Sequence, residues 1–184
     1  MKMISALLLA VAAGPIWAAP FSTPIVNKSS VTFVSKQMGV SVTGGFSQFT
    51  SQISLDPAHP QIGKAQIEVA VASIDAGSSE ANDEVKGKSW FNVKQFPVAS
   101  FVSSDVKALG GNRYQATGKL TIKGVSHQVV VPFTANPLGF LLVLDGAIPI
   151  SRAQYSLGEG AWSDPSVVAD AVQIRFHFTL GAGK

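Results

Sequence analysis

The chain has 184 residues, a net charge of +3, eleven Phe, three Trp and no cysteine. That length fits one domain that is large enough to bury its own core. Because Lys and Arg are scattered singly and no disulfide can form within the chain, the composition excludes a basic surface for nucleic acid and a small disulfide-stapled module.

The N-terminal residues have the layout of a secretory signal. Lys2 precedes an apolar run over residues 4–13, and the small residue Ala18 suits cleavage by a signal peptidase. The run is too short to span a bilayer. We therefore expect residues 1–18 to be a signal peptide, residues 19–184 to form one β-barrel domain, and the protein to be exported to the periplasm.

Apolar and polar residues alternate with a period of two along most of the remaining chain, and this pattern predicts strands with one buried face. Turn signals such as Gly110-Gly111-Asn112 and Lys123-Gly124 separate the strands and predict hairpins. About eight strands follow one another, mostly through short connections. In chain order they are SVTFVSK, a bent strand from Val40 to Leu55, KAQIEVAVAS, ASFVSSDVK, RYQATGKLTIKG, HQVVVPF, GFLLVLDGAI and AVQIRFHFTL.

One segment between the third and fourth strands departs from the alternation. The stretch SSEANDEVKGKSWF, from Ser78, has capping and acidic residues first and lysines last. This order predicts a short helix whose charges suit its dipole at both ends. We expect the helical crossover to lie over one end of the barrel, with Val85, Trp90 and Phe91 above the opening.

Sequential antiparallel strands leave open edges, and closing the sheet into a barrel removes them. We therefore predict an all-β fold, an antiparallel eight-stranded barrel with the short helical crossover capping one end. Strand alternation turns the following large side chains inward: Ile67, Val69, Leu120, Phe133, Phe176 and Phe178. The small inward residues Ala65, Ala99, Ala116 and Gly118 leave room. An eight-stranded barrel holds its own side chains or one small ligand, so composition alone supports a solid core and a binding cavity equally.

Residues that carry catalysis or bind metals are sparse. His59, His127 and His177 lack metal-ligand spacing, and no Ser lies in a Gly-x-Ser-x-Gly turn. Four carboxylates cluster around the expected helix start, where they suit capping: Asp75, Glu80, Asp83 and Glu84. We predict no catalytic residue, no metal site and no cofactor.

Five blocks in order resemble the YceI-like family, exported bacterial barrels implicated in binding polyisoprenoids. They are SVTFVSKQMGVSVTGGFSQFTSQISLD, VASIDAG followed by ND, WFNVKQFPVASFVS, GKLTIKGVSHQVVVPF and ISRAQYSLG. Together they span about Ser30 to Leu180. The chain departs from the family pattern at Asn82 and Asn92, where a basic and an acidic residue are common.

The resemblance implies a lipocalin-like barrel with an elongated apolar tunnel, a lid, and a long-chain isoprenoid lipid held non-covalently, such as a quinone tail. Its motif positions add the following ligand-binding residues: Phe33, Phe46, Phe49, Ile74, Phe91 and Phe101. We expect Phe91 and Phe101 to touch the lipid, and Trp90 and Phe96 to hold the lid down. The candidates for contact with the headgroup are Asn92, Ser103 and Tyr155.

The expected partner is therefore the isoprenoid lipid, with no nucleic acid, while transient membrane contact and a homodimer are left open. Two other functions remain as alternatives. An enzyme that modifies the bound lipid would need an acid–base pair inside the barrel. A structural partner of a membrane redox system would need a contiguous apolar patch on the outside.

Overall fold

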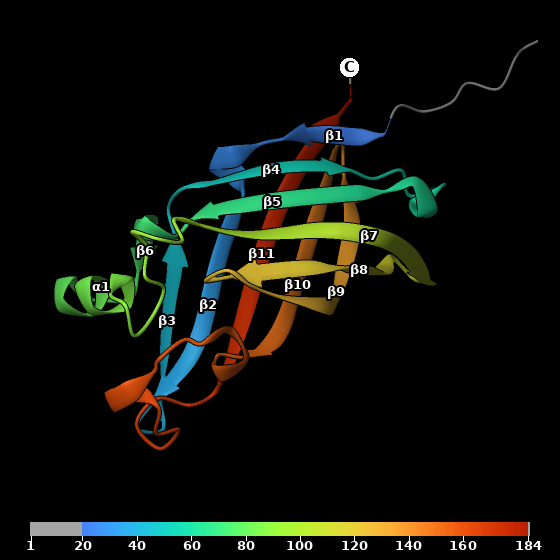
Figure 1. The fold of residues 1–184 in the computed structure, drawn as a ribbon. Coiled ribbons are helices and arrows are strands. Elements are labelled where there is room, and N and C mark those ends of the chain that lie inside the picture. Colours follow the sequence, from blue (N-terminus) through green and yellow to red (C-terminus); the bar gives the residue numbers. More distant parts are fainter. Residues whose placement is uncertain (1–19, 184) are drawn as a thin grey trace, which may run out of the picture.

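The structure is a computed structural model that describes residues 20–183, so the expected signal peptide lies outside the described residues. The described chain forms one strongly curled antiparallel sheet and one short α-helix (Figure 1). None of its described helices is long and apolar enough to cross a membrane. The elements are β1 (Phe21–Pro24), β2 (Ser30–Gln37), β3 (Val40–Phe46), β4 (Phe49–Ser54), β5 (Lys64–Ala70), β6 (Ile74–Asp75), α1 (Ser79–Lys86), β7 (Val98–Gly110), β8 (Arg113–Ile122), β9 (Val125–Leu138), β10 (Leu141–Ser151) and β11 (Ala171–Ala182).

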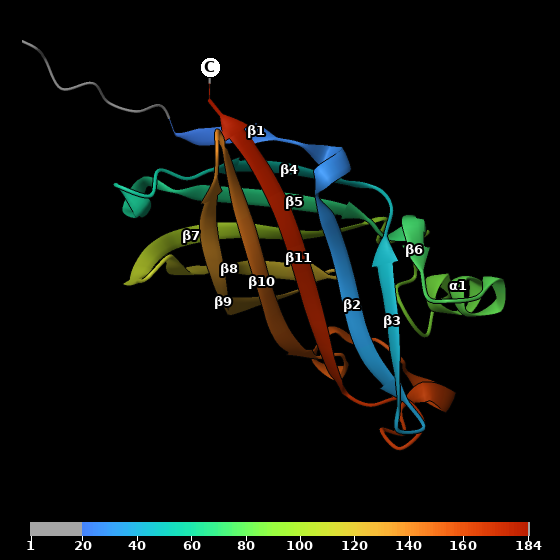
Figure 2. The same cartoon turned by 180° about the vertical axis from the view of Figure 1, so that it is seen from behind.

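The strands follow the order β4-β5-β7-β8-β9-β10-β11-β2-β3-β6 across the sheet. Strong curling makes β4, β5, β7 and β8 cross β2, β3, β10 and β11 on the opposite wall (Figures 1 and 2). Short β1 pairs with the end of β11 and also bridges to the end of β4, where Phe21 and Leu55 exchange two N–H···O bonds of 3.0 Å. This strand therefore joins the two walls at one end of the curled sheet.

The prediction of an all-β antiparallel barrel with a helical crossover is confirmed, but residues 20–183 form eleven strands instead of the expected eight. The bent strand from Val40 to Leu55 is divided into β3 and β4, because Ser47 N–H and Gln48 N–H bond to the carbonyl and hydroxyl of Ser73 and turn the chain. The other two additional strands, β1 and β6, have four and two residues, too few to show an alternation.

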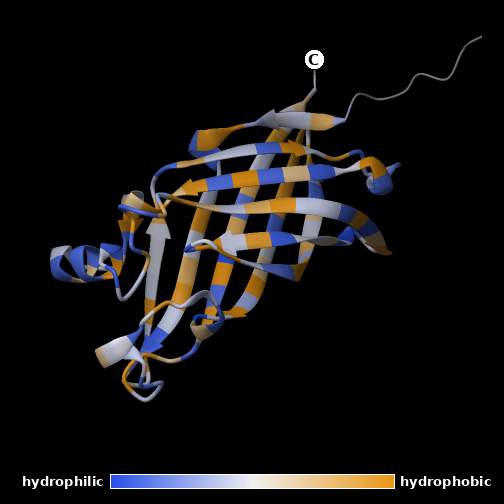
Figure 3. Cartoon of the chain, viewed as in Figure 1, coloured by the Kyte–Doolittle hydropathy of each residue, from blue (hydrophilic) through white to orange (hydrophobic). Residues whose placement is uncertain are grey.

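Hydropathy alternates along the strands as the pattern predicts (Figure 3). In β8 the inward positions Tyr114, Ala116, Leu120 and Ile122 are all buried. The hairpin that follows turns at Lys123 and Gly124, both with positive φ, which matches the right-handed twist of the paired strands.

The helix predicted from Ser78 is confirmed as α1. The Ser78 hydroxyl caps its N-terminus by accepting a hydrogen bond from Ala81 N–H at 3.2 Å, and Lys86 lies in its last turn. Although α1 lies beside β3 and β6, none of its residues is buried (Figure 1). Tertiary packing therefore contributes little to holding this helix in place.

Candidate ligand-binding cavity

A cavity of about 700 Å³ lies between the inward faces of the curled sheet. Two segments complete its wall. We call α1 together with residues 87–97 the lid, and residues 152–170, which connect β10 to β11, the strap; both contribute lining side chains. The volume falls within the roughly 300–1,000 Å³ of small-molecule sites, whose linings are mostly apolar with a few polar groups.

Eleven of the twelve expected ligand-binding residues line this cavity: Phe33, Phe46, Ile67, Val69, Ile74, Phe91, Phe101, Leu120, Phe133, Phe176 and Phe178. Phe49 is not among the lining residues. Its ring packs edge-on against Phe178 in the interior, with 6.0 Å between ring centroids, beside the cavity and without lining it. Whether the eleven residues contact a ligand stays a prediction.

Ring contacts join the aromatic lining into groups, two of which lie on the strands. Phe46 lies between Phe33 and Phe91, at centroid distances of 5.9 and 6.4 Å, so the wall made by β2 and β3 continues into the lid. On β11, Phe176 and Phe178 stack at 5.6 Å. These contacts hold the ring faces in fixed orientations along the lumen.

Small side chains enlarge the cavity at three of the four expected positions. Ala65, Ala99 and Ala116 line it, whereas Gly118 does not. The ring of Phe101 covers Gly118 so closely that a Cβ there would lie 2.6 Å from the ring Cζ. The expectation that Gly118 itself leaves free space was wrong, because the neighbouring ring uses that space.

Sequence reasoning missed the contribution of the strap and the aliphatic residues between the aromatic ones. Val131, Ile148 and Ile174 line the cavity on inward strand positions that the alternation already indicated. Leu157 and Trp162 line it from the strap, which has no strand or helix period to reveal which side chains face inward.

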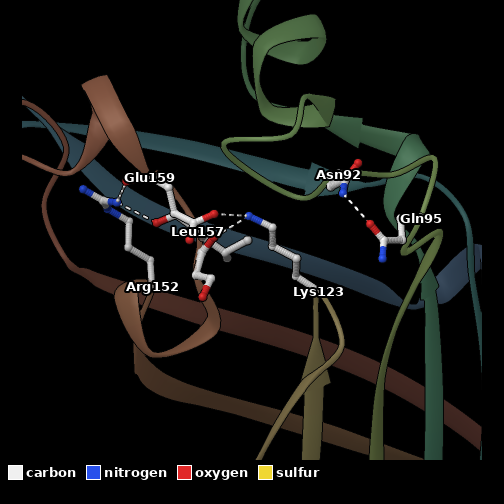
Figure 4. Close-up of polar contacts among 8 residues, drawn as sticks. Asn92, Gln95, Lys123, Arg152, Leu157 and Glu159 are labelled. Carbon is white, nitrogen blue, oxygen red and sulfur yellow. Dashed lines mark hydrogen bonds and ion pairs between the residues drawn. The ribbon is translucent and has the colours of Figure 1, made fainter.

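Arg152, at the start of the strap, is almost completely buried. Its guanidinium uses all five N–H groups on backbone carbonyls, and Figure 4 shows the side chain beside Leu157. The acceptors are Leu157, Gly158, Trp162, Val168 and Ala169, at 2.6 to 3.2 Å. The cation also lies 5.4 Å from the ring centre of Trp90. Arg152 therefore organises the strap and has no N–H left to offer an anion in the cavity.

Polar contacts fasten the strap to the lid and to the β8–β9 turn. The carbonyl of Ser89 accepts from Gly158 N–H and Glu159 N–H at 2.8 and 2.9 Å. Lys123 Nζ donates to the Ser156 carbonyl at 2.6 Å and to Glu159 Oε2 at 2.8 Å (Figure 4). These contacts hold the N-terminal half of the strap in a defined position.

A further hydrogen bond and a ring contact join the strap to the lid. The indole N–H of Trp162 donates to Glu84 Oε1 at 2.6 Å, and the Trp162 ring lies 6.0 Å from Trp90. The indole nitrogen of Trp90 is buried among the described residues without a hydrogen-bond partner. Phe96, in contrast, does not line the cavity; it lies against the β8–β9 turn, where a Cβ on Gly124 would come 2.7 Å from its ring. Phe96 thus contacts a neighbour of the lid and stays outside the cavity, whereas Trp90 contacts the strap and also lines the cavity, so its role is not confined to holding the lid.

None of the three residues expected at a headgroup lines the cavity. Tyr155 is buried against His127, and burial raises the pKa of its hydroxyl. The Ser103 hydroxyl accepts from Ala65 N–H at 2.8 Å, and the Asn92 amide donates to Gln95 at 3.0 Å (Figure 4). The polar lining comes instead from β2, β4, β5, β7, the lid and the strap: Ser35, Gln37, Ser54, Lys64, Ser78, Glu80, Glu84, Ser100 and Arg152.

The histidines lie apart, each with its own partner. His59 pairs with Asp56 at 2.9 Å, His127 bonds the Gln154 carbonyl at 3.1 Å, and His177 pairs with Asp145 at 2.7 Å on the outside of the sheet. Within residues 20–183 no group of His, Asp and Glu is arranged to hold a metal ion. The carboxylates that border the cavity, Glu80 and Glu84, are both exposed on α1.

The cavity, the lid and the curled sheet can be compared with known proteins. The family model described as the YceI-like domain matches residues 24–180. The chain belongs to this family. Two curated relatives, each named UPF0312 protein, are 31% identical to it. The Azotobacter vinelandii match covers 55% of this chain and 53% of that protein, and the Pseudomonas savastanoi match covers 75% and 74%.

Solved structures share the fold. BcnA from Burkholderia cenocepacia is 47% identical, has a TM-score of 0.83, and the match covers 85% of this chain and 98% of BcnA. The Campylobacter jejuni YceI protein has a TM-score of 0.70 at 17% identity, over 77% of this chain and 85% of that one. A Saccharophagus degradans protein described as a polyisoprenoid binding domain has a TM-score of 0.67 at 16% identity, over 91% of this chain and all of that one.

Proposed function

We propose that this YceI-like protein is exported to the periplasm and holds one long-chain isoprenoid lipid non-covalently in its cavity, as a carrier or a store. The observation that carries the proposal is the apolar cavity of about 700 Å³ inside the barrel. Membership of the YceI-like family, and the polyisoprenoid binding described for the Saccharophagus protein, support this class of ligand.

The size of the cavity suits several isoprene units. An apolar protein cavity of roughly 150 Å³ holds one benzene. A volume of about 700 Å³ therefore has room for about four to five groups of that size. Each five-carbon unit gains about 4 kcal/mol on leaving water, before the costs of association and chain ordering. We expect affinity to rise with chain length and to level off once the cavity is full.

The charges around the cavity favour a neutral headgroup, such as a quinone ring. All N–H groups of Arg152 are used within the strap. The other cation that lines the cavity, Lys64, lies at the start of β5, at the end of that strand away from α1 (Figure 1). Glu80 and Glu84 add two carboxylates at the α1 end of the cavity. A diphosphate at that end would meet these carboxylates without an available lining cation beside it, whereas Ser35 and Gln37 suit a neutral acceptor.

The test is mass spectrometry of the full chain expressed in a Gram-negative host, under native and then denaturing conditions. We expect a neutral isoprenoid lipid that stays bound in the first spectrum and is released in the second. Val131→Phe should reduce its occupancy, since Val131 lines the cavity, whereas Val130→Phe, on the exposed face of the same strand, should not. Equal occupancy in both variants, or no bound lipid and no binding of added isoprenoids, would contradict the proposal.

Export is tested separately by cell fractionation and by N-terminal sequencing of the purified protein. The expected result is a periplasmic protein that starts at Ala19. A cytoplasmic protein that retains Met1 would refute export and would leave the ligand proposal standing.

A further inference from the structure

Three of the aromatic rings that line the cavity lie on glycines of neighbouring strands. Phe33 pairs directly with Gly44 across β2 and β3, and Phe176 pairs directly with Gly146 across β11 and β10. Phe101 covers Gly118 diagonally between β7 and β8. The three pairs lie on three different strand pairs, so they are spread around the barrel.

Each ring occupies the space that a side chain on its glycine would need. A Cβ built on Gly44, Gly118 or Gly146 would come within 3.0 Å of a ring carbon of its partner, closer than real Cβ atoms approach their neighbours. None of the three glycines lines the cavity, although all three rings do. The ring faces are therefore the wall, and the absence of a side chain beneath them lets the wall stand back from the lumen.

We propose that Gly44, Gly118 and Gly146 determine the width of the cavity and thereby its selectivity for methyl-branched isoprenoid chains over straight alkyl chains. Any side chain at these positions displaces its ring toward the lumen, and it also meets a backbone carbonyl, that of Asp75 at Gly44, of Val102 at Gly118 and of Pro132 at Gly146. Closely packed interiors do not absorb even one added methylene without strain, so the displaced ring takes its volume from the ligand. The inference rests on the proposed function for its choice of ligand.

A narrower cavity weakens the binding of a branched chain more than that of a straight chain. Its methyl groups make it thicker than a straight chain with the same number of carbons, and a narrower lumen rejects the thicker chain first. One methylene more or less in an apolar pocket changes binding about 10- to 200-fold. Narrowing the lumen at a single ring should therefore separate the two ligands clearly.

The test compares farnesol with pentadecan-1-ol, which have the same headgroup and the same number of carbons, by displacement of N-phenyl-1-naphthylamine. We expect Gly146→Ala to weaken farnesol binding about tenfold or more and pentadecan-1-ol binding less. The matched control is Gly181→Ala on β11, where the nearest atoms to an added Cβ lie at an ordinary 3.7 Å. This control should bind both alcohols like the wild type.

A Cβ on Gly146 would also lie 2.8 Å from the Pro132 carbonyl, so the single variant puts folding at risk. The double variant Gly146→Ala/Phe176→Ala removes the ring contact and keeps the contact with the Pro132 carbonyl, so it separates the two effects. It should bind farnesol like Phe176→Ala alone. The inference is overturned if Gly146→Ala binds farnesol like the wild type or loses both alcohols equally. It is also overturned if the double variant is as impaired in folding and farnesol binding as Gly146→Ala alone, since the backbone contact then accounts for the loss.

Failure of the proposed function gives a different result. If the wild type binds neither alcohol, the lipid proposal fails, and the glycines are then tested by a crystal structure of Gly146→Ala. A Phe176 ring displaced into the lumen would support their role in setting the cavity width, whereas an unmoved ring would overturn it.

Discussion

Replacing Arg152 by Met should strongly destabilise the protein, because the strap is built around this side chain. Met has a similar length and fills the space, but it removes all five N–H donors at once. Three of the five hydrogen bonds, to Leu157, Gly158 and Val168, are buried, so those carbonyls lose their partner without regaining water. The other two acceptors are only partly buried and can be rehydrated.

The loss in free energy of unfolding can be estimated from these contacts. Each buried carbonyl left without a donor costs about 1–3 kcal/mol, and relief from burying a cation offsets part of the sum. We expect a net loss of about 3–5 kcal/mol, as for breaking other buried charged contacts. In a chain of this size that loss lowers the Tm by roughly 6–20 °C. Arg152→Lys should fall between, since an ammonium has three donors instead of five.

The assay is thermal and urea unfolding followed by circular dichroism, with tryptophan fluorescence as a local probe of Trp90 and Trp162. The matched control is Arg175→Met on the outer face of β11, where the guanidinium bonds only the side chain of Gln173. It should change stability by less than about 0.5 kcal/mol. The prediction is refuted if Arg152→Met lowers the free energy of unfolding by less than about 1 kcal/mol, or by no more than Arg175→Met does.

Three further outcomes follow from the lid and the wall. Glu84→Ala removes the hydrogen bond that the Trp162 indole donates to α1, a helix without buried residues, and should raise the hydrogen-exchange rate of the α1 amides about tenfold. Asp83→Ala should leave that rate unchanged, and equal exchange rates in the two variants would contradict this prediction. Phe49→Ala should lower stability by about 2–3 kcal/mol and leave ligand affinity unchanged, since this ring packs on Phe178 without lining the cavity; a large loss of affinity would show direct contact. The Ser151 hydroxyl and the Ala153 N–H lower the pKa of Asp170 below 3.8. The ionised carboxylate therefore stabilises the fold at neutral pH, and this stabilisation is lost as the pH falls through the lowered pKa. If Asp170→Asn unfolds in acid as steeply as the wild type, the prediction is refuted.

Several elements were predictable because their signals are local. Alternation turned Leu120 and Phe176 inward, and the run of caps and charges from Ser78 located α1, since backbone geometry and solvent contact fix both patterns within a few residues. The residues expected to contact the headgroup were predicted wrongly because their role depends on contacts that are not local. Tyr155 and Ser103 have polar groups, but only distant partners decide whether such a group faces a cavity or is used within the fold.

Local patterns alone specify an antiparallel barrel with a mostly apolar interior, because a period of two and turn residues set which face of each strand is buried. Whether that interior is a cavity or a solid core depends on contacts between distant strands. Phe101 and Phe176 are equally compatible with either, and the outcome depends on the glycines beneath them on neighbouring strands, where the rings find room against the sheet. Such contacts join residues far apart in the chain, so no local pattern can reveal them.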